Sequence, residues 1–185
     1  HTLHALDART GKPRWRYTAE GRIDSPPTVA GGRVHFGCAD GRAYCLRARD
    51  GATAWRYLVA PEERQIVSRQ QVESLWPLNG SLLVQGGTVY ALAGRNMFFD
   101  GGMRLALLDS RTGRKRSETV LNELIPGTDK NLQTLIAPNK SMPLANPDLL
   151  SSDGRRIYMQ TQKFDLEGKR LEIGPQPPSP RVSEG

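Results

Sequence analysis

The sequence predicts an all-β fold built from repeated four-stranded antiparallel units. Three observations favour this fold: an internal repeat with a period of about 40 residues, glycine turns at hairpin spacing, and short apolar runs between those turns. The 185 residues include 19 Gly and 13 Pro, and 37% are hydrophobic. This composition suits short strands joined by many turns better than it suits long helices.

The repeat is clearest when residues 5–17 (ALDARTGKPRWRY) are aligned with residues 45–57 (CLRARDGATAWRY). The two segments share a turn glycine and the same Trp-Arg-Tyr ending, offset by about 40 residues. A third copy, residues 108–116 (LDSRTGRKR), follows at a longer interval, so its unit contains an insertion. A period near 40 is typical of propeller blades and also of paired-helix solenoids.

Local turn signals decide between these two architectures. Residues 29–38 (VAGGRVHFGC) have the pattern of two strands joined by a Gly-Gly turn. Asp40-Gly41 then predicts a hairpin, and Asp50-Gly51 predicts the turn before a fourth strand over 53–58. Strands this short, joined by tight turns, exclude a helical solenoid, and the sequence predicts a partial β-propeller.

The same pattern divides most of the chain into blades. We expect a partial propeller over 1–174. Its units are a half blade at 2–18, a blade at 26–58, a blade at 74–121 with an insertion at 94–102, and a blade at 147–171. The first residues read as the interior of a strand and no initiator Met is present, so we expect the chain to begin partway through a larger protein.

Three segments do not fit the blade pattern. Residues 60–73 are polar, and we expect a connection with room for a short helix after Pro61. Residues 122–147 contain several prolines and predict a long surface loop, and residues 175–185 (PQPPSPRVSEG) predict a flexible tail or linker.

The repeat also resembles a known motif. Residues 5–15 (ALDARTGKPRW) match the tryptophan-docking motif of pyrroloquinoline-quinone (PQQ) propellers, A-x-D-x-x-T-G-K-x-x-W, at every fixed position. The second copy keeps Gly51 and Trp55 but has Arg47 in place of Asp, and the third has Ser117 in place of Trp. The chain therefore resembles the PQQ-like (quinoprotein alcohol dehydrogenase-like) β-propeller family of exported bacterial type.

The resemblance implies structural roles for the most distinctive residues. It implies that Trp15 and Trp55 dock one blade against the next and do not touch a substrate. Asp7 and Asp109 lie at the turns of the motif, where we expect carboxylates that hydrogen-bond the turn backbone.

The sequence offers no candidate catalytic residue and no candidate metal ligand, and it leaves cofactor-binding residues unknown. It contains no adjacent cysteines and no Cys-x-x-Cys-His haem site, and His1, His4 and His35 stand singly. Cys38 and Cys45 flank the Asp40-Gly41 hairpin. Simple pairing places Cys38 opposite Ala43, so that Cys38 and Cys45 would share a face as diagonal neighbours. A disulfide between them would be strained, and we expect two buried free thiols.

The insertion at 94–102 (GRNMFFDGG) is the most interesting loop, because loops at the ends of a propeller commonly carry binding residues. It places Phe98 and Phe99 between Arg95 and Asp100. The alternative is that Met97, Phe98 and Phe99 cover a neighbouring blade.

The charge pattern indicates a solvated surface. The net charge is +7 with an isoelectric point near 9.8, but the basic residues are scattered along turns and strands. We therefore expect no nucleic-acid partner. No apolar stretch is long enough to span a membrane as a helix.

Two main functions remain open at this point. The first is a non-catalytic binding or scaffold propeller of the cell envelope, with protein or envelope components and the remaining blades of the same propeller as partners. The alternative is a PQQ-dependent alcohol or sugar dehydrogenase whose active site lies partly outside this segment, and only this alternative requires PQQ and Ca²⁺. A weaker third hypothesis is a sensor or substrate-docking domain of an export-related fusion. The resemblance implies a periplasmic or otherwise exported protein.

Overall fold

The computed structural model describes residues 1–68, 70–125, 127–131, 147–160 and 162–171, and these residues form strands and turns without any helix. They make three four-stranded and two two-stranded antiparallel sheets. The strands are β1 (Thr2–Leu6), β2 (Pro13–Thr18), β3 (Thr28–Ala30), β4 (Arg33–Gly37), β5 (Arg42–Arg47), β6 (Thr53–Leu58), β7 (Gln65–Ser68), β8 (Gln71–Ser74), β9 (Leu83–Gln85), β10 (Thr88–Ala93), β11 (Met103–Asp109), β12 (Lys115–Leu121), β13 (Leu150–Ser152), β14 (Ile157–Met159), β15 (Gln162–Phe164) and β16 (Arg170–Leu171).

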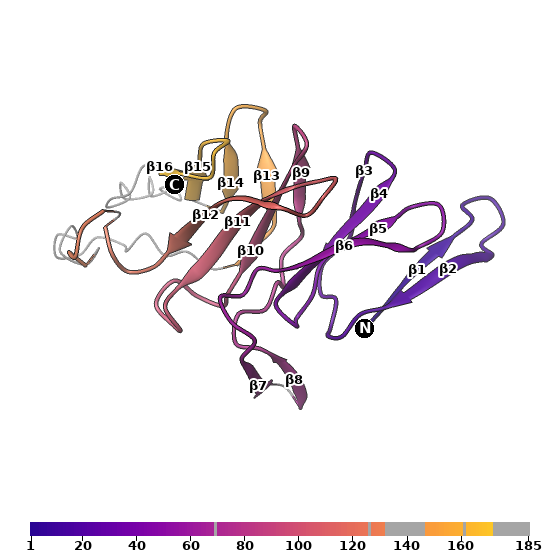
Figure 1. Cartoon of the computed structure of the whole chain (residues 1–185), viewed down its shortest axis with the longest axis horizontal. Coiled ribbons are helices and arrows are strands. Elements are labelled where there is room, and N and C mark those ends of the chain that lie inside the picture. Colours follow the sequence, from indigo (N-terminus) through magenta and orange to yellow (C-terminus); the bar gives the residue numbers. More distant parts are fainter. Residues whose placement is uncertain (69, 126, 132–146, 161, 172–185) are drawn as a thin grey trace, which may run out of the picture.

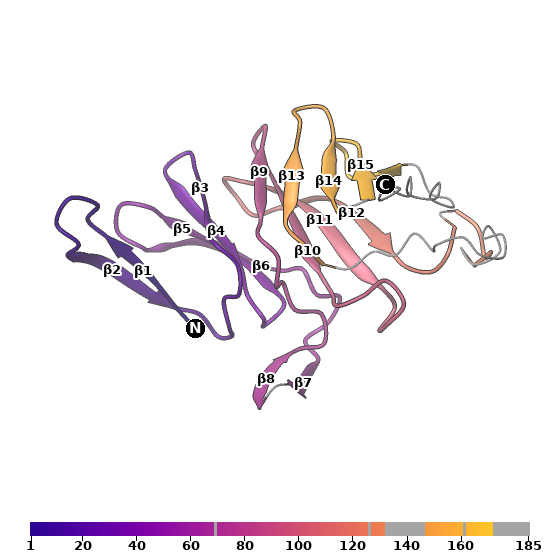
Figure 2. The same cartoon turned by 180° about the vertical axis from the view of Figure 1, so that it is seen from behind.

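The sheets stand side by side as the blades of a partial propeller (Figures 1 and 2). Within β3–β6, β9–β12 and β13–β16 the strand order follows the sequence, so each blade is a simple meander. The pair β1–β2 precedes them as a two-stranded sheet. The all-β fold of four-stranded antiparallel blades predicted from the sequence is confirmed.

The hydrophobic core lies between the blades and is divided into three parts. One cluster joins β1–β2 to the β3–β6 sheet, the second joins β3–β6 to β9–β12, and the third joins β9–β12 to β13–β16. Strand β10 shows how one strand contributes to two of these clusters, since all six of its residues are buried. Val89 and Ala91 face the second cluster while Tyr90 and Leu92 face the third, as alternation along a strand requires.

The connection at 60–73 differs from the prediction. It contains no helix, and residues 65–74 form the hairpin β7–β8, which projects from one end of the blades (Figure 1). The segments QIVS and QVES are too short and too polar to show the polar–apolar alternation that signals a strand in a sequence.

The predicted register of the cysteine hairpin was wrong by one residue. Gly37, rather than Cys38, pairs with Ala43, and His35 pairs with Cys45. Cys38 consequently packs in the cluster beside β1–β2, while Cys45 packs in the cluster on the other face of the sheet. Both cysteines are free and buried, as predicted.

Two predicted segments fall partly or wholly on residues that the structure does not describe. The predicted tail at 175–185 lies outside the described residues, as does the part of the predicted loop at 132–146. The described start of that loop contains a bridge between Leu124 and Asn131. Among the described residues, no segment forms a helix that is long and apolar enough to cross a membrane.

Candidate functional site

The tryptophans of the repeat contact the next blade along the chain. Trp15 on β2 donates its indole N–H to the carbonyl oxygen of Ala48, at 2.9 Å. Its ring lies over Gly51, where a Cβ atom would approach the ring to 2.7 Å. Gly51 has a φ of 72°, so this position needs glycine both for its backbone conformation and for the close approach of the ring.

Trp55 on β6 makes the same contact one blade later. Its indole N–H donates to the carbonyl oxygen of Ser110 at 3.0 Å, and its ring lies over Gly113, where a Cβ would approach to 2.6 Å. Trp55 is buried, whereas Trp15 is half-buried. Both tryptophans are therefore occupied by contacts between blades.

The turn carboxylates act within the turns. Oδ1 of Asp7 accepts hydrogen bonds from the backbone amides of Arg9 and Thr10 and from the Thr10 hydroxyl, at 2.9–3.1 Å. Asp109 repeats this pattern with Arg111 and Thr112, and Arg116 binds its other oxygen at 2.6 Å. Hydrogen bonds to Thr10 hold the pKa of Asp7 below its usual value, and Arg116 does the same for Asp109.

At the third blade contact, the large and the small residue of the cross-strand pair have exchanged places. Ala5 pairs with Trp15 and Cys45 with Trp55, but at the third position Leu107 pairs with Ser117. The turn glycine of the last blade, Gly168, is covered by the Leu107 side chain, to which a Cβ at this glycine would approach within 2.7 Å. The large side chain has moved from the outer strand to its neighbour.

This exchange predicts that a tryptophan can be restored only together with a small partner. Leu107→Ala should destabilise the fold, and adding Ser117→Trp should restore about 1–2 kcal/mol because the indole covers Gly168 in place of the leucine. Urea denaturation of the single and double variants measures the coupling. Ser117→Trp alone should give no gain, and a double variant no more stable than Leu107→Ala would contradict the exchange.

A cluster of charged and polar side chains lies at the end of the blades from which β7–β8 projects. Glu73 on β8 is only 4% exposed, and its two carboxylate oxygens bind Arg22 at 3.1 Å and Arg95 at 2.5 Å. Arg22 also donates to Asp24 at 2.5 Å and to Gln71 at 3.2 Å. The bond to Asp24 is the main reason that the pKa of Arg22 lies above its usual value.

This cluster ties three separate connections together and borders a cavity. Arg22 precedes β3, Glu73 belongs to the projecting hairpin, and Arg95 begins the insertion between β10 and β11. The adjoining cavity of about 600 Å³ is lined by Arg22, Asp24, Ser68, Glu73, Asn79, Arg95 and Pro147. The Asn79 side-chain oxygen is buried there without a hydrogen-bond partner among the described residues. Of the residues in this cluster and its cavity, only Arg95 was named as a candidate binding residue from the sequence.

The insertion divides between core packing and exposure. Met97 is buried in the third cluster, and Phe98 packs against the same cluster. Phe99, by contrast, is 64% exposed. The carbonyl oxygen of Asp100 accepts the indole N–H of Trp76 at 2.9 Å. Met97 and Phe98 therefore pack in the core, as the alternative predicted, while a binding role for the exposed Phe99 stays a prediction.

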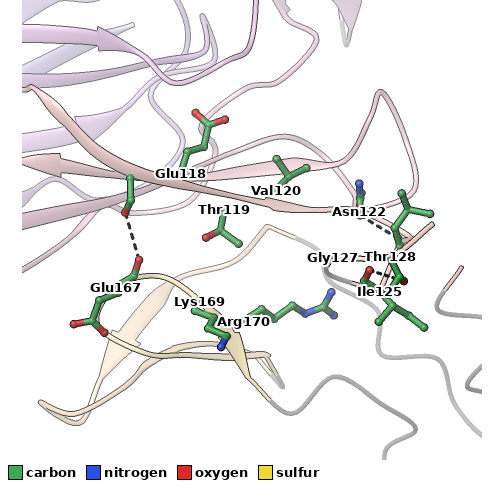
Figure 3. A pocket seen from close by; sticks show the side chains of 12 residues that line it. Glu118, Thr119, Val120, Asn122, Ile125, Gly127, Thr128, Glu167, Lys169 and Arg170 are labelled. Atoms are coloured by element: carbon green, nitrogen blue, oxygen red, sulfur yellow. Dashed lines mark hydrogen bonds between the residues drawn. The ribbon is translucent and has the colours of Figure 1, made fainter. Parts of the chain in front are cut away.

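A second large cavity, of about 720 Å³, lies between β12 and the last blade (Figure 3). Its polar groups join the two sheets: Ser117 donates to the carbonyl of Glu167 at 3.3 Å, and Thr119 donates to that of Gly168 at 2.8 Å. Arg170, which points into the cavity in Figure 3, donates to Gln162 at 2.8 Å, and burial lowers its pKa. This cavity belongs to the blade contact.

The residues at the projecting end do not match a calcium site. Both oxygens of Glu73 are bound by guanidinium groups, so this carboxylate has no oxygen left over for a hard cation. Among the described residues, no three His, Cys, Asp or Glu side chains lie close enough together to hold a metal ion.

Comparisons with known proteins agree with this architecture. Residues 1–166 match the profile of the PQQ-like family described as outer membrane protein assembly factor BamB. No curated protein sequence matches the chain.

Solved propellers share the fold at low identity. BamB from Moraxella catarrhalis is 19% identical with a TM-score of 0.57, and the match covers 92% of this chain and 45% of that one. Quinohemoprotein alcohol dehydrogenase from Comamonas testosteroni is 17% identical with a TM-score of 0.63, covering 92% and 31%. The corresponding enzyme ADHIIG from Pseudomonas putida HK5 is 17% identical with a TM-score of 0.60, covering 84% and 25%.

The present chain thus spans less than half the length of each of these proteins. Because the family profile covers residues 1–166, the chain belongs to the PQQ-like β-propeller family described as outer membrane protein assembly factor BamB.

Proposed function

We propose that this chain is part of a non-catalytic propeller that binds protein partners in the cell envelope, in a periplasmic or otherwise exported location. Membership of the BamB-described family supports this role. In this proposal Trp15 and Trp55 dock the blades, and further blades of the same propeller extend the two-stranded sheet β1–β2.

The β7–β8 hairpin is the observation that carries the proposal. It projects from the blades (Figure 2), and its cross-strand pair Val67 and Val72 is 77% and 59% exposed. An exposed apolar pair on a short hairpin with two open edges suits contact with another protein, including addition of a partner strand. The ion pairs of Glu73 fix the base of the hairpin to the neighbouring loops.

Site-specific photo-crosslinking of the full-length protein in its native host tests this role. A crosslinking residue in place of Val67 should give a discrete product with an envelope protein, and Val72→Asp should reduce that product at least tenfold. Val29, which is 67% exposed on β3, is the matched control position and should give no such product. Equal crosslinking from both positions, or no effect of Val72→Asp, would count against the proposal.

The alternative hypothesis is a PQQ-dependent alcohol or sugar dehydrogenase, since quinohemoprotein alcohol dehydrogenases share the fold. The two functions are separated by adding PQQ and Ca²⁺ to the full-length protein and measuring quinone absorbance and dye reduction. Stoichiometric PQQ binding with turnover would overturn the scaffold proposal.

A further inference from the structure

A third cavity lies at the opposite end of the blades from the projecting hairpin. It has a volume of about 600 Å³ and lies between the β3–β6 and β9–β12 blades, whose inner strands β3 and β9 are neighbours (Figure 1). Its walls come from the two Gly-Gly turns after β3 and β9 and from the turn between β11 and β12. The residues with polar side chains in this lining are Arg33, His35, Gln85, Ser110 and Arg111.

His35, in the lining of this cavity, has a buried side chain with no hydrogen-bond partner among the described residues. Its side chain is fully buried, and neither ring nitrogen forms a hydrogen bond to any described residue. Its ring contacts Trp55, with the ring centroids 5.7 Å apart. A buried imidazole normally satisfies its donor and its acceptor, so an unpartnered imidazole in the wall of a cavity indicates a missing partner.

The charged residues that line the cavity together with His35 are two arginines. Arg33 lies two residues earlier on the same face of β4, with Nη1 3.9 Å from the sulfur of Cys45. Arg111 lies on the facing turn. Neither arginine forms an ion pair with a carboxylate of the described residues, and no Asp or Glu lines the cavity. Asp109 beside Arg111 is engaged by Arg116 and by its own turn.

We propose that this cavity binds the phosphate group of a small soluble phosphate ester. Two guanidinium groups supply paired donors that match phosphate oxygens, and His35 supplies a further donor from within the blade contact. The cavity is larger than a phosphate ion and has the size of ordinary small-molecule sites, which leaves room for the rest of the ester.

The proposal is tested by calorimetric titration of the intact chain with glycerol phosphate and with inorganic phosphate at constant ionic strength. We expect saturable binding, tighter for the ester. Arg33→Gln and Arg111→Gln should each weaken the affinity at least tenfold. Arg9→Gln is the matched control, because Arg9 holds the equivalent turn position of the first unit and lies outside the cavity; it should change the affinity less than twofold.

A second readout follows the His35 ring by NMR. Binding should shift its ring resonances, and sulfate should bind more tightly at pH 5 than at pH 7, because sulfate keeps its charge in this range and an anion beside the ring favours the protonated imidazole. Unchanged His35 resonances at saturating phosphate would overturn the proposal. So would an equal loss of affinity in Arg9→Gln, which would indicate general attraction to a basic surface.

Discussion

Replacement of Trp55 by alanine is expected to lower the free energy of unfolding by about 3–5 kcal/mol. Trp55 is only 8% exposed, and its indole N–H is the hydrogen-bond donor to Ser110 in the neighbouring blade. Truncation would open a cavity above Gly113 and leave the Ser110 carbonyl oxygen without this donor. Urea denaturation followed by circular dichroism measures the loss.

Trp15→Ala is the matched comparison, since Trp15 makes the same hydrogen bond and the same glycine contact while half-buried. Trp15→Ala should lower the free energy of unfolding by roughly half as much as Trp55→Ala, because less apolar surface is exposed to water. Trp55→Phe separates the two contributions, and should lose about 1 kcal/mol through the missing N–H. A Trp55→Ala variant no less stable than Trp15→Ala would refute the assignment of the effect to burial between blades.

The blades could be predicted from the sequence because their signals are local. Gly51 and Asp50 mark a turn within a few residues, and Trp55 repeats Trp15 at the blade period. The size exchange at Leu107 and Ser117 leaves no such signal, since it is visible only when both strands of the pair are known.

The polar cluster could not be predicted for a related reason. Arg22, Glu73 and Arg95 lie on three connections, and only the stacking of blades brings them together. The β7–β8 hairpin was missed because its strands are short and mostly polar, without an alternation of polar and apolar residues. The Cys38 register was missed because the turn before Arg42 is longer than a two-residue hairpin loop.

The stability of the chain is expected to fall by about 2 kcal/mol between pH 7 and pH 5 because of His35. Burial, and secondly the charge of Arg33, lower the pKa of His35 from 6.5 to about 4 in the folded protein. Below pH 6.5 the unfolded chain therefore binds a proton that the folded chain does not. The contribution of the neutral His35 side chain to the free energy of unfolding is fully present above pH 6.5 and is lost as the pH falls toward 4. Denaturant midpoints measured across this range give the slope of the free energy of unfolding against pH.

His35→Gln should remove this slope whatever its effect on stability at pH 7, while His4→Gln, at an exposed position of β1, should leave the slope unchanged. The turn carboxylates do not obscure the window, because Asp7 and Asp109 have lowered pKa values and lose their contribution only below about pH 4. Arg33 acts on His35, Cys45 pairs with it on β5, and Arg111 lines the same cavity. Burial raises the pKa of the Cys45 thiol, so it stays neutral. A slope that persists in His35→Gln would place the proton uptake elsewhere. Sulfate should reduce the slope in the native chain but not in His35→Gln, because an oxyanion beside the ring offsets the cost of charging it.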